Sequence, residues 1–285
     1  MIGQPAARRT ARDGNRAVAS PGEVTTRQRR ALLNDVTLEH GPLDLFGRFL
    51  LRADTAARRR DVTLSFAPVE GLVAVNRANP ESWRPLLPIF DPARSDLSDQ
   101  NCFCILGHNA KGEIVATQAA RLYDWSNTNF HDEASSLRLL YSDPARLKGE
   151  HEAIEVTVPE AKSLGGAVVF SGGIWYRPDY RGRSLTRIIP FISRTIAYSR
   201  WRHDCTLSIM AEEVHKGGMA ERTGFSNVGW TVTLRRTPVN PVGDIRCALV
   251  WMHEDEMLAG IASSLARLDA QVDAGVRERR AEQHG

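Results

Sequence analysis

The sequence predicts an α/β (α+β) fold in which a central sheet is flanked by helices. Short alternating or continuous apolar runs recur along the chain and predict strands. Longer segments with apolar residues three and four positions apart predict amphipathic helices between them. The 285 residues, 42% of them hydrophobic and 25% charged, suit one large globular domain or two small ones.

Basic residues are concentrated near the start of the chain. Residues 1–60 contain 12 arginines and six acidic side chains, whereas the remainder contains 25 basic and 28 acidic side chains. The body is therefore mildly acidic, which argues against a nucleic-acid-binding body and leaves that role, if any, to the basic tail. Residues 1–36 carry few large apolar side chains, so we expect them to be a disordered basic tail.

The four cysteines and the N-terminus bear on cellular location. Cys102 and Cys104 are two residues apart in a strand-like run, a spacing that suits neither a mutual disulfide nor a zinc site. We expect buried thiols in a reducing compartment and no bound metal. No signal-peptide core and no run of membrane-spanning length is present, so the expected location is cytoplasmic, with no membrane partner.

The expected organisation has four parts. After the tail, residues 37–60 form an N-terminal docking helix, residues 61–253 form the main domain, and residues 254–285 form a C-terminal helix and tail. The docking helix ends in three arginines at 58–60, which we interpret as a solvated charged face, with RNA or anionic lipid as the alternative.

The elements of the main domain follow from local patterns. Residues 69–98 are helical in parts and interrupted by prolines, and the turn residues at 109–112 join a hairpin. Helices are also expected near 132–141, at 183–199 with a bend at Pro190, and at 216–224. Strands are expected at 61–68, 101–108, 112–125, 153–160, 166–178, 205–214, 227–236 and 247–253.

One junction between a predicted strand and a predicted helix gives the clearest indication of a binding site. The apolar run 166–178, with a bulge expected at Gly172 and Gly173, leads into a turn rich in arginine and small residues at 181–186. A helix follows at once. Backbone N–H groups at the start of a helix are unpaired and lie at the positive end of its dipole, so they suit a phosphate. An ordinary basic cap is the alternative.

The order of these elements resembles the GNAT (N-acetyltransferase) superfamily. The resemblance rests on the strand ending Ile174-Trp175-Tyr176-Arg177-Pro178, the turn at 181–186, the helix after it, and Arg222-Thr223-Gly224-Phe225 before the next strand, and it spans roughly residues 61–253. It implies a mixed, mostly antiparallel sheet of about six to seven strands. It also implies acetyl-CoA as the acyl donor and N-acetyltransferase activity on an amine.

The resemblance also implies a donor site. Ile174 and Tyr176 would offer backbone bonds to the acyl-pantetheine arm. The turn would wrap the pyrophosphate, with a set of cofactor-binding residues made of Arg181, Gly182, Arg183, Ser184, Leu185 and Thr186.

The sequence gives weaker evidence for catalytic residues than for the donor site. A tyrosine that often serves as the acid in such enzymes is replaced by Ala220, and the strand 166–178 carries no Asp, Glu or His to act as a base. Glu212 and His215, at the end of the next strand, are the candidate bases, and Tyr176 is the candidate acid. A solvated strand end and a packing role are the alternatives.

Two functions follow from these observations. The first is an acyl-CoA-dependent N-acyltransferase that transfers an acetyl group directly to the primary amine of an unidentified acceptor. The second is a catalytically silent GNAT-like module that binds acyl-CoA or a partner protein. The C-terminal helix has heptad spacing over about two heptads, so it packs on the body or forms the seam of a homodimer.

Overall fold

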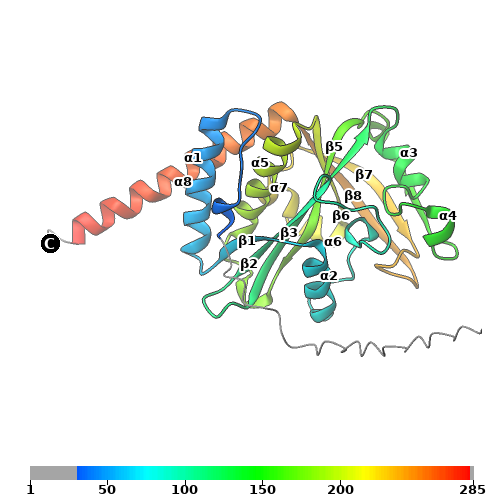
Figure 1. Cartoon of the computed structure of the whole chain (residues 1–285), viewed down its shortest axis with the longest axis horizontal. Coiled ribbons are helices and arrows are strands. Elements are labelled where there is room, and N and C mark those ends of the chain that lie inside the picture. Colours follow the sequence, from blue (N-terminus) through cyan, green and yellow to red (C-terminus); the bar gives the residue numbers. More distant parts are fainter. Residues whose placement is uncertain (1–30, 283–285) are drawn as a thin grey trace, which may run out of the picture.

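The computed structural model describes residues 31–282, and for residues 275–282 it describes the backbone alone. Eight strands form one sheet in the order β1-β2-β3-β5-β6-β8-β7-β4 (Figure 1). Every neighbouring pair is antiparallel except β5 and β6, which run parallel. The predicted mixed, mostly antiparallel sheet flanked by helices is therefore confirmed. Every strand expected from the sequence joins the sheet, so the count of six to seven was too low.

The strands have the following bounds: β1 Thr63–Ala67, β2 Cys102–His108, β3 Ile114–Trp125, β4 Ala153–Val156, β5 Gly166–Tyr176, β6 Cys205–Ala211, β7 Asn227–Arg235 and β8 Asp244–His253. The α-helices are α1 Leu43–Arg58, α2 Val69–Ala78, α3 Phe130–Ser135, α4 Pro144–Leu147, α5 Ile189–Trp201, α6 Glu212–Lys216, α7 Met219–Thr223 and α8 Glu254–Glu282. Short 3₁₀ turns are η1 Leu32–Asn34, η2 Pro88–Phe90, η3 Pro159–Lys162, η4 Pro178–Tyr180 and η5 Leu185–Arg187.

The sheet separates two hydrophobic cores. Helices α1, α5 and α8 cover one face, and α2, η2 and α3 cover the other (Figure 1). Alternation along the strands supplies both cores, since Phe103 and Ile105 face the first core while Cys102 and Cys104 face the second. All four cysteines are buried free thiols, as expected.

The N-terminal segment differs from the expectation. Residues 1–30 lie outside the described residues, but residues 31–36, which we expected to be disordered, are placed. Leu32 is completely buried in the core with Phe46 and Phe49 of α1, and η1 contacts β1. Leu33 and Val36 also pack against this core, so several apolar side chains together offset the cost of ordering the segment.

The helix after the turn at 181–186 starts later than expected. The segment predicted to be helical from 183 first forms η5, and α5 begins at Ile189. Pro190 therefore lies in the first turn of α5, where no intrahelical N–H bond is lost, and the expected bend is absent from this helix. Strand β6 also ends early, at Ala211, because Glu212 begins a short helix.

Helix α5 is fixed to the segment after α7 by a buried arginine. The Arg194 guanidinium donates to the Thr223 carbonyl and lies 4.6 Å from the centre of the Phe225 ring. Burial lowers the pKa of Arg194 to about 9. This contact holds Gly224 and Phe225, with Gly224 in a left-handed conformation at φ +78°, against the helix that follows the turn.

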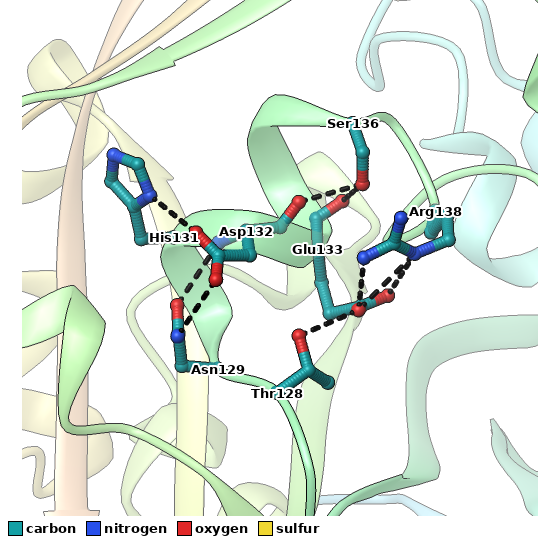
Figure 2. A network of polar contacts seen from close by, with 7 residues as sticks. All are labelled: Thr128, Asn129, His131, Asp132, Glu133, Ser136 and Arg138. Carbon is teal, nitrogen blue, oxygen red and sulfur yellow. Dashed lines mark hydrogen bonds and ion pairs between the residues drawn. The ribbon is translucent and has the colours of Figure 1, made fainter.

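Helix α3 illustrates how short helices on the second face are held (Figure 2). Asn129 accepts a bond from the backbone N–H of Asp132 and so caps the helix. Glu133 is almost buried and receives bonds from Arg138 and from the Thr128 hydroxyl. The Arg138 guanidinium therefore compensates the charge of Glu133. We interpret this network as one that stabilises the fold.

The C-terminal helix packs on the body. Met257, Ile261, Leu265 and Leu268 are buried in the first core, and α8 lies against α1. Among the described helices, none is long and apolar enough to cross a membrane.

The burial of Leu32 leads to a stability prediction. Leu32→Ala is expected to lower the free energy of unfolding by about 2–5 kcal/mol, because it leaves a cavity in a close-packed core. Leu51→Ala is the control, since Leu51 is 62% exposed, and a change within about 0.5 kcal/mol is expected. Urea unfolding measures both. Equal effects would show that Leu32 does not pack in the core in solution.

His203 leads to a prediction on pH. It is buried, its Nε2 lies 2.7 Å from the Thr206 hydroxyl, and burial with nearby Arg194 lowers its pKa to about 3. Between this value and the ordinary pKa of about 6.5, the unfolded chain binds a proton that the folded chain does not. Stability from this group is therefore lost as the pH falls from about 6.5 towards 3.

His203→Gln is expected to reduce this acid-side slope, which is at most about 1.4 kcal/mol per pH unit for one proton. The measurement is urea unfolding at several pH values, with His253→Gln as the control because His253 is exposed. An unchanged slope in His203→Gln would contradict a neutral buried His203.

Candidate functional site

Strands β5 and β6 separate soon after they meet. They pair only between residues 168–170 and 205–207, although both strands continue to Tyr176 and Ala211. On the other side of β5, the register with β3 shifts between Thr117 and Ala119, opposite the two glycines, so the expected bulge is confirmed. The strand edges beyond Phe170 and Leu207 therefore face a gap in the ladder.

The glycines in this gap are required by close packing. A side chain at Gly172 would place its Cβ 2.7 Å from Cε2 of Phe90, and Gly173 has a φ of +60° with Ala119 and Leu72 close by. The backbone of β5 thus comes close to the second core at the point where the two strands separate.

The turn after β5 has an unusual backbone. Gly182 has a φ of +79° and Ser184 a φ of +58°, and a Cβ at Gly182 would meet nothing within 4 Å. Among the described residues, no acceptor is found for the backbone N–H groups of Gly182, Arg183 and Ser184. The turn therefore presents several free donors to open space in front of it.

The turn is held by the end of α1. The Arg60 Nε donates to the Arg183 carbonyl over 2.8 Å, and the Tyr180 hydroxyl donates to Asp61 over 2.7 Å. The Arg183 guanidinium lies 3.9 Å from the centre of the Tyr180 ring. The expectation that the arginines at 58–60 form only a solvated face was therefore wrong for Arg60, because its guanidinium satisfies a carbonyl of the turn.

A cavity of about 410 Å³, here called the turn cavity, opens at this turn. Its lining includes Arg181, Arg187 and Arg222, and none of its lining residues is acidic. Its full lining is Tyr176, Tyr180, Arg181, Gly182, Ser184, Leu185, Thr186, Arg187, Met219 and Arg222. Positive charge, hydroxyls and free N–H groups in one cavity suit a phosphate-bearing ligand.

Arg181 connects the turn cavity with its neighbour. Its guanidinium donates to the carbonyls of Tyr176 and Ser82, over 3.2 and 3.0 Å. The segment that begins at Ser82 forms a wall of a second cavity. The cation is thus oriented by two backbone acceptors and still lines the turn cavity.

The second cavity, here called the apolar cavity, has a volume of about 230 Å³ and lies in the gap between β5 and β6. Residues 172–174 of β5 and 208–211 of β6 form two of its walls, and residues 83–87 with Phe90 form another. Met219 lines both this cavity and the turn cavity, so the two adjoin. Ile174, predicted to contact an acyl-pantetheine arm, lies here.

Tyr176 is the predicted catalytic residue that the structure places beside the turn. It lines the turn cavity and is 7% exposed, and its hydroxyl has no hydrogen-bond partner among the described residues. Burial raises the pKa of Tyr176, so its hydroxyl stays protonated at physiological pH. The raised pKa also makes this hydroxyl a weaker acid than an ordinary tyrosine.

Glu212 and His215 are not brought to the turn. Glu212 accepts from Lys216 over 2.9 Å and from Arg246 over 3.2 Å, and the bond from Lys216 lowers the pKa of Glu212. It lines a third cavity of about 320 Å³ with Glu213. His215 lies edge-on against the Trp230 ring, 5.2 Å between centres.

The third cavity, here called the charged cavity, adjoins the apolar cavity through Arg84, which lines both. Arg84 forms an ion pair with Glu213 over 2.7 Å. The three cavities therefore follow one another, and Met219 and Arg84 mark the two junctions.

Several residues of this region were missed in the sequence. Met219 and Arg222 come from the helix before Gly224, Arg187 follows the predicted turn directly, and Arg60 lies just after α1, far away in the sequence. Arg222 and Arg187 stand beside residues that were singled out, so their charge was an available signal. No signal in the sequence indicated Arg60 or Met219, because their contacts at the site depend on the tertiary fold.

A larger cavity lies away from the turn. It has a volume of about 730 Å³ at the edge of the sheet, next to Phe66 and Trp201, and its lining includes Glu39, Glu70 and Asp99. Three carboxylates against the single cation Arg200 oppose an anionic ligand, so this cavity is not the phosphate-binding candidate. Within the described residues no group of three or more His, Cys, Asp or Glu side chains is arranged to hold a metal ion.

Comparisons with known proteins give distant structural neighbours. No protein-family model and no curated protein sequence matches this chain. A variant of the spermidine N-acetyltransferase SpeG from Vibrio cholerae has 11% identity and a TM-score of 0.39, and the match covers 70% of this chain and 96% of that one. NAA60 of Arabidopsis thaliana, solved with acetyl-CoA, has 13% identity and a TM-score of 0.37, with 68% and 99% covered.

The first of these neighbours is an N-acetyltransferase, and the second was solved in complex with acetyl-CoA. A protein of unassigned activity from Bacillus halodurans is another neighbour, with 10% identity, a TM-score of 0.39, and 73% and 92% of the two chains covered. At such distances the likeness gives no residue a role, so each role below depends on the geometry of this chain.

Tyr176 leads to a prediction that separates it from Tyr180. Tyr176→Phe is expected to leave the free energy of unfolding unchanged or to raise it by about 1 kcal/mol, because it removes a buried hydroxyl without a partner. Tyr180→Phe is the matched control and is expected to lower it by about 1 kcal/mol, since it removes the bond to Asp61. Both are measured by urea unfolding, and an equal loss in the two variants would mean that the Tyr176 hydroxyl is bonded in solution.

Proposed function

We propose that this protein is an acyl-CoA-dependent N-acyltransferase that transfers an acyl group, such as acetyl, directly to the primary amine of an acceptor. The observation that carries the proposal is the adjacency of the turn cavity and the gap between β5 and β6. A basic, phosphate-sized site beside an unpaired strand edge suits a ligand with a pyrophosphate at one end and an amide-bearing arm at the other.

The pyrophosphate would bind at the turn. The free N–H groups of Gly182 and Ser184 would supply donors, and Arg181, Arg187 and Arg222 would supply charge. The hydroxyls of Ser184 and Thr186 line the same cavity and add donors. Leu185 is buried and serves to anchor the turn rather than to bind ligand.

The pantetheine arm would run from the turn cavity past Met219 to the edge of β5. Beyond Phe170 this edge has no strand partner on the β6 side, so its backbone groups near Ile174 are available to the amides of the arm. The same edge would place a backbone N–H near the thioester carbonyl, where it stabilises the charge that develops as the amine attacks.

The transfer itself needs two proton movements. The amine nitrogen forms a bond to the acyl carbon as the carbon–sulfur bond breaks, the amine loses one proton, and the departing thiolate takes one. Tyr176 is the proposed donor to the thiolate, because it lines the turn cavity and its hydroxyl has no hydrogen-bond partner among the described residues. We retain Glu212 as the proposed group on the acceptor side, where its ionised carboxylate attracts an ammonium group. His215, which contacts Trp230, is the weaker candidate for the base.

A second function is favoured by one specific observation. No carboxylate and no histidine is found among the residues that line the turn cavity and the apolar cavity. A GNAT-like module that binds acyl-CoA without turnover fits that lining. The two functions make the same prediction for binding and differ in whether free CoA is released when amines are supplied.

The turn provides the decisive test. Gly182→Glu is expected to weaken acetyl-CoA binding by at least about 100-fold, because it adds a negative charge in front of the phosphate donors. Gly182→Gln is the matched control, with the same bulk and the same strain at a φ of +79° but no charge, and it is expected to lose much less. Calorimetric titration with acetyl-CoA and CoA measures both variants.

Equal affinity in wild type and a folded Gly182→Glu variant would remove the turn as the phosphate site. Binding that depends on Gly182, followed by release of CoA in an acceptor-amine screen, would support the transferase. Binding without release across that screen would support the silent module.

A further inference from the structure

The apolar cavity has a lining that points to its ligand. Phe90 and Phe170 pack edge to face at 6.1 Å between ring centres, and Trp83 stacks on Trp175 at 5.7 Å. Aliphatic side chains from residues 86–87 and 209–210 complete the walls. Ser208 is the only hydroxyl in the lining and Arg84 the only charge. The cavity therefore favours an uncharged, apolar group.

The position of this cavity relates it to the acyl end of the donor. It begins at residues 172–174, where the unpaired edge of β5 would hold the end of the arm, and it adjoins the turn cavity at Met219. A chain attached to a thioester at this edge would extend directly between β5 and β6.

An amine acceptor fits the same cavity poorly. Its single charged residue, Arg84, is a cation that would repel an ammonium group and is already paired with Glu213. The charged cavity beyond Arg84 is lined by Glu212, Glu213 and Asp244 and also by Arg84 and Arg246, so it suits a polar acceptor better than the apolar cavity does. The apolar cavity therefore suits the acyl chain of the donor, and the charged cavity suits the polar acceptor.

We propose that the apolar cavity binds the acyl chain of the donor, so that the preferred donor carries a saturated chain longer than acetyl. This inference rests on the proposed function, because it assumes that the turn cavity holds the CoA phosphates. The cavity volume of about 230 Å³ is roughly eight times the volume of one water in the liquid, which accommodates a short acyl chain.

Chain length provides a direct readout in binding. Each methylene moved from water into an apolar site contributes enough to tighten binding by about fourfold. Calorimetric titration of the full chain with CoA, acetyl-CoA, butanoyl-CoA and hexanoyl-CoA is expected to show affinity rising by up to about fourfold per methylene and levelling off once the cavity is filled.

The variant that tests the cavity is Ala211→Phe. Ala211 is half-buried at the end of β6 and lines the apolar cavity, so a phenyl ring there occupies the space for the chain. Ala211→Phe is expected to abolish the rise with chain length and to leave the affinity for CoA unchanged. Ala93→Phe is the matched control, because Ala93 is exposed and lines none of the three cavities, and it is expected to keep the rise.

Val214→Trp is a second test of the same cavity, for the case in which Ala211→Phe does not fold. Val214 is 40% exposed on α6 and lines the same cavity, and its replacement is expected to weaken hexanoyl-CoA relative to CoA. Affinity that stays flat from CoA to hexanoyl-CoA, with binding that still depends on Gly182, would overturn this inference alone. A failure of CoA and every acyl-CoA to bind the folded wild type would instead overturn the proposed function.

Discussion

The site depends on one interruption in hydrogen bonding. Strands β5 and β6 pair over only three residues on each strand, at 168–170 and 205–207, and then separate while both continue. Backbone groups left without a strand partner are costly when buried, so this part of the sheet is stable only where solvent or a ligand reaches the gap. The glycines at 172 and 173 strengthen the constraint, because Phe90 packs where a side chain at 172 would lie.

The turn beyond this gap is held from outside the strand–turn–helix unit. Arg60 and Asp61, at the end of α1, bind the Arg183 carbonyl and the Tyr180 hydroxyl. Helix α1 shares one hydrophobic core with α5 and α8. Helices from the two ends of the described chain therefore share one core with α5, the helix that follows the turn.

The sequence predicted those features of the site that depend on residues close together in the chain. The apolar run of β5, the glycine at 182 and the helix that follows were all readable, because each depends on neighbours within a few residues. The walls of the cavities were not, since Met219, Arg60 and Trp83 meet the site only through tertiary contacts. Glu212 shows the intermediate case. Its place at the end of a strand was predicted, but β6 ends at Ala211, and the start of α6 places the carboxylate in the charged cavity.

The succession of cavities constrains the direction of any reaction at this site. Positive charge is concentrated around the turn, the middle cavity has one ion-paired cation, and carboxylates appear beyond Arg84. An anionic group is favoured at the turn and disfavoured in the middle, where uncharged groups fit without a desolvation cost, and the charged cavity beyond carries both signs of charge. Because the middle cavity lies against the unpaired edge of β5, the same gap that leaves backbone donors free also excludes competing charge from the place where an acyl group would be transferred.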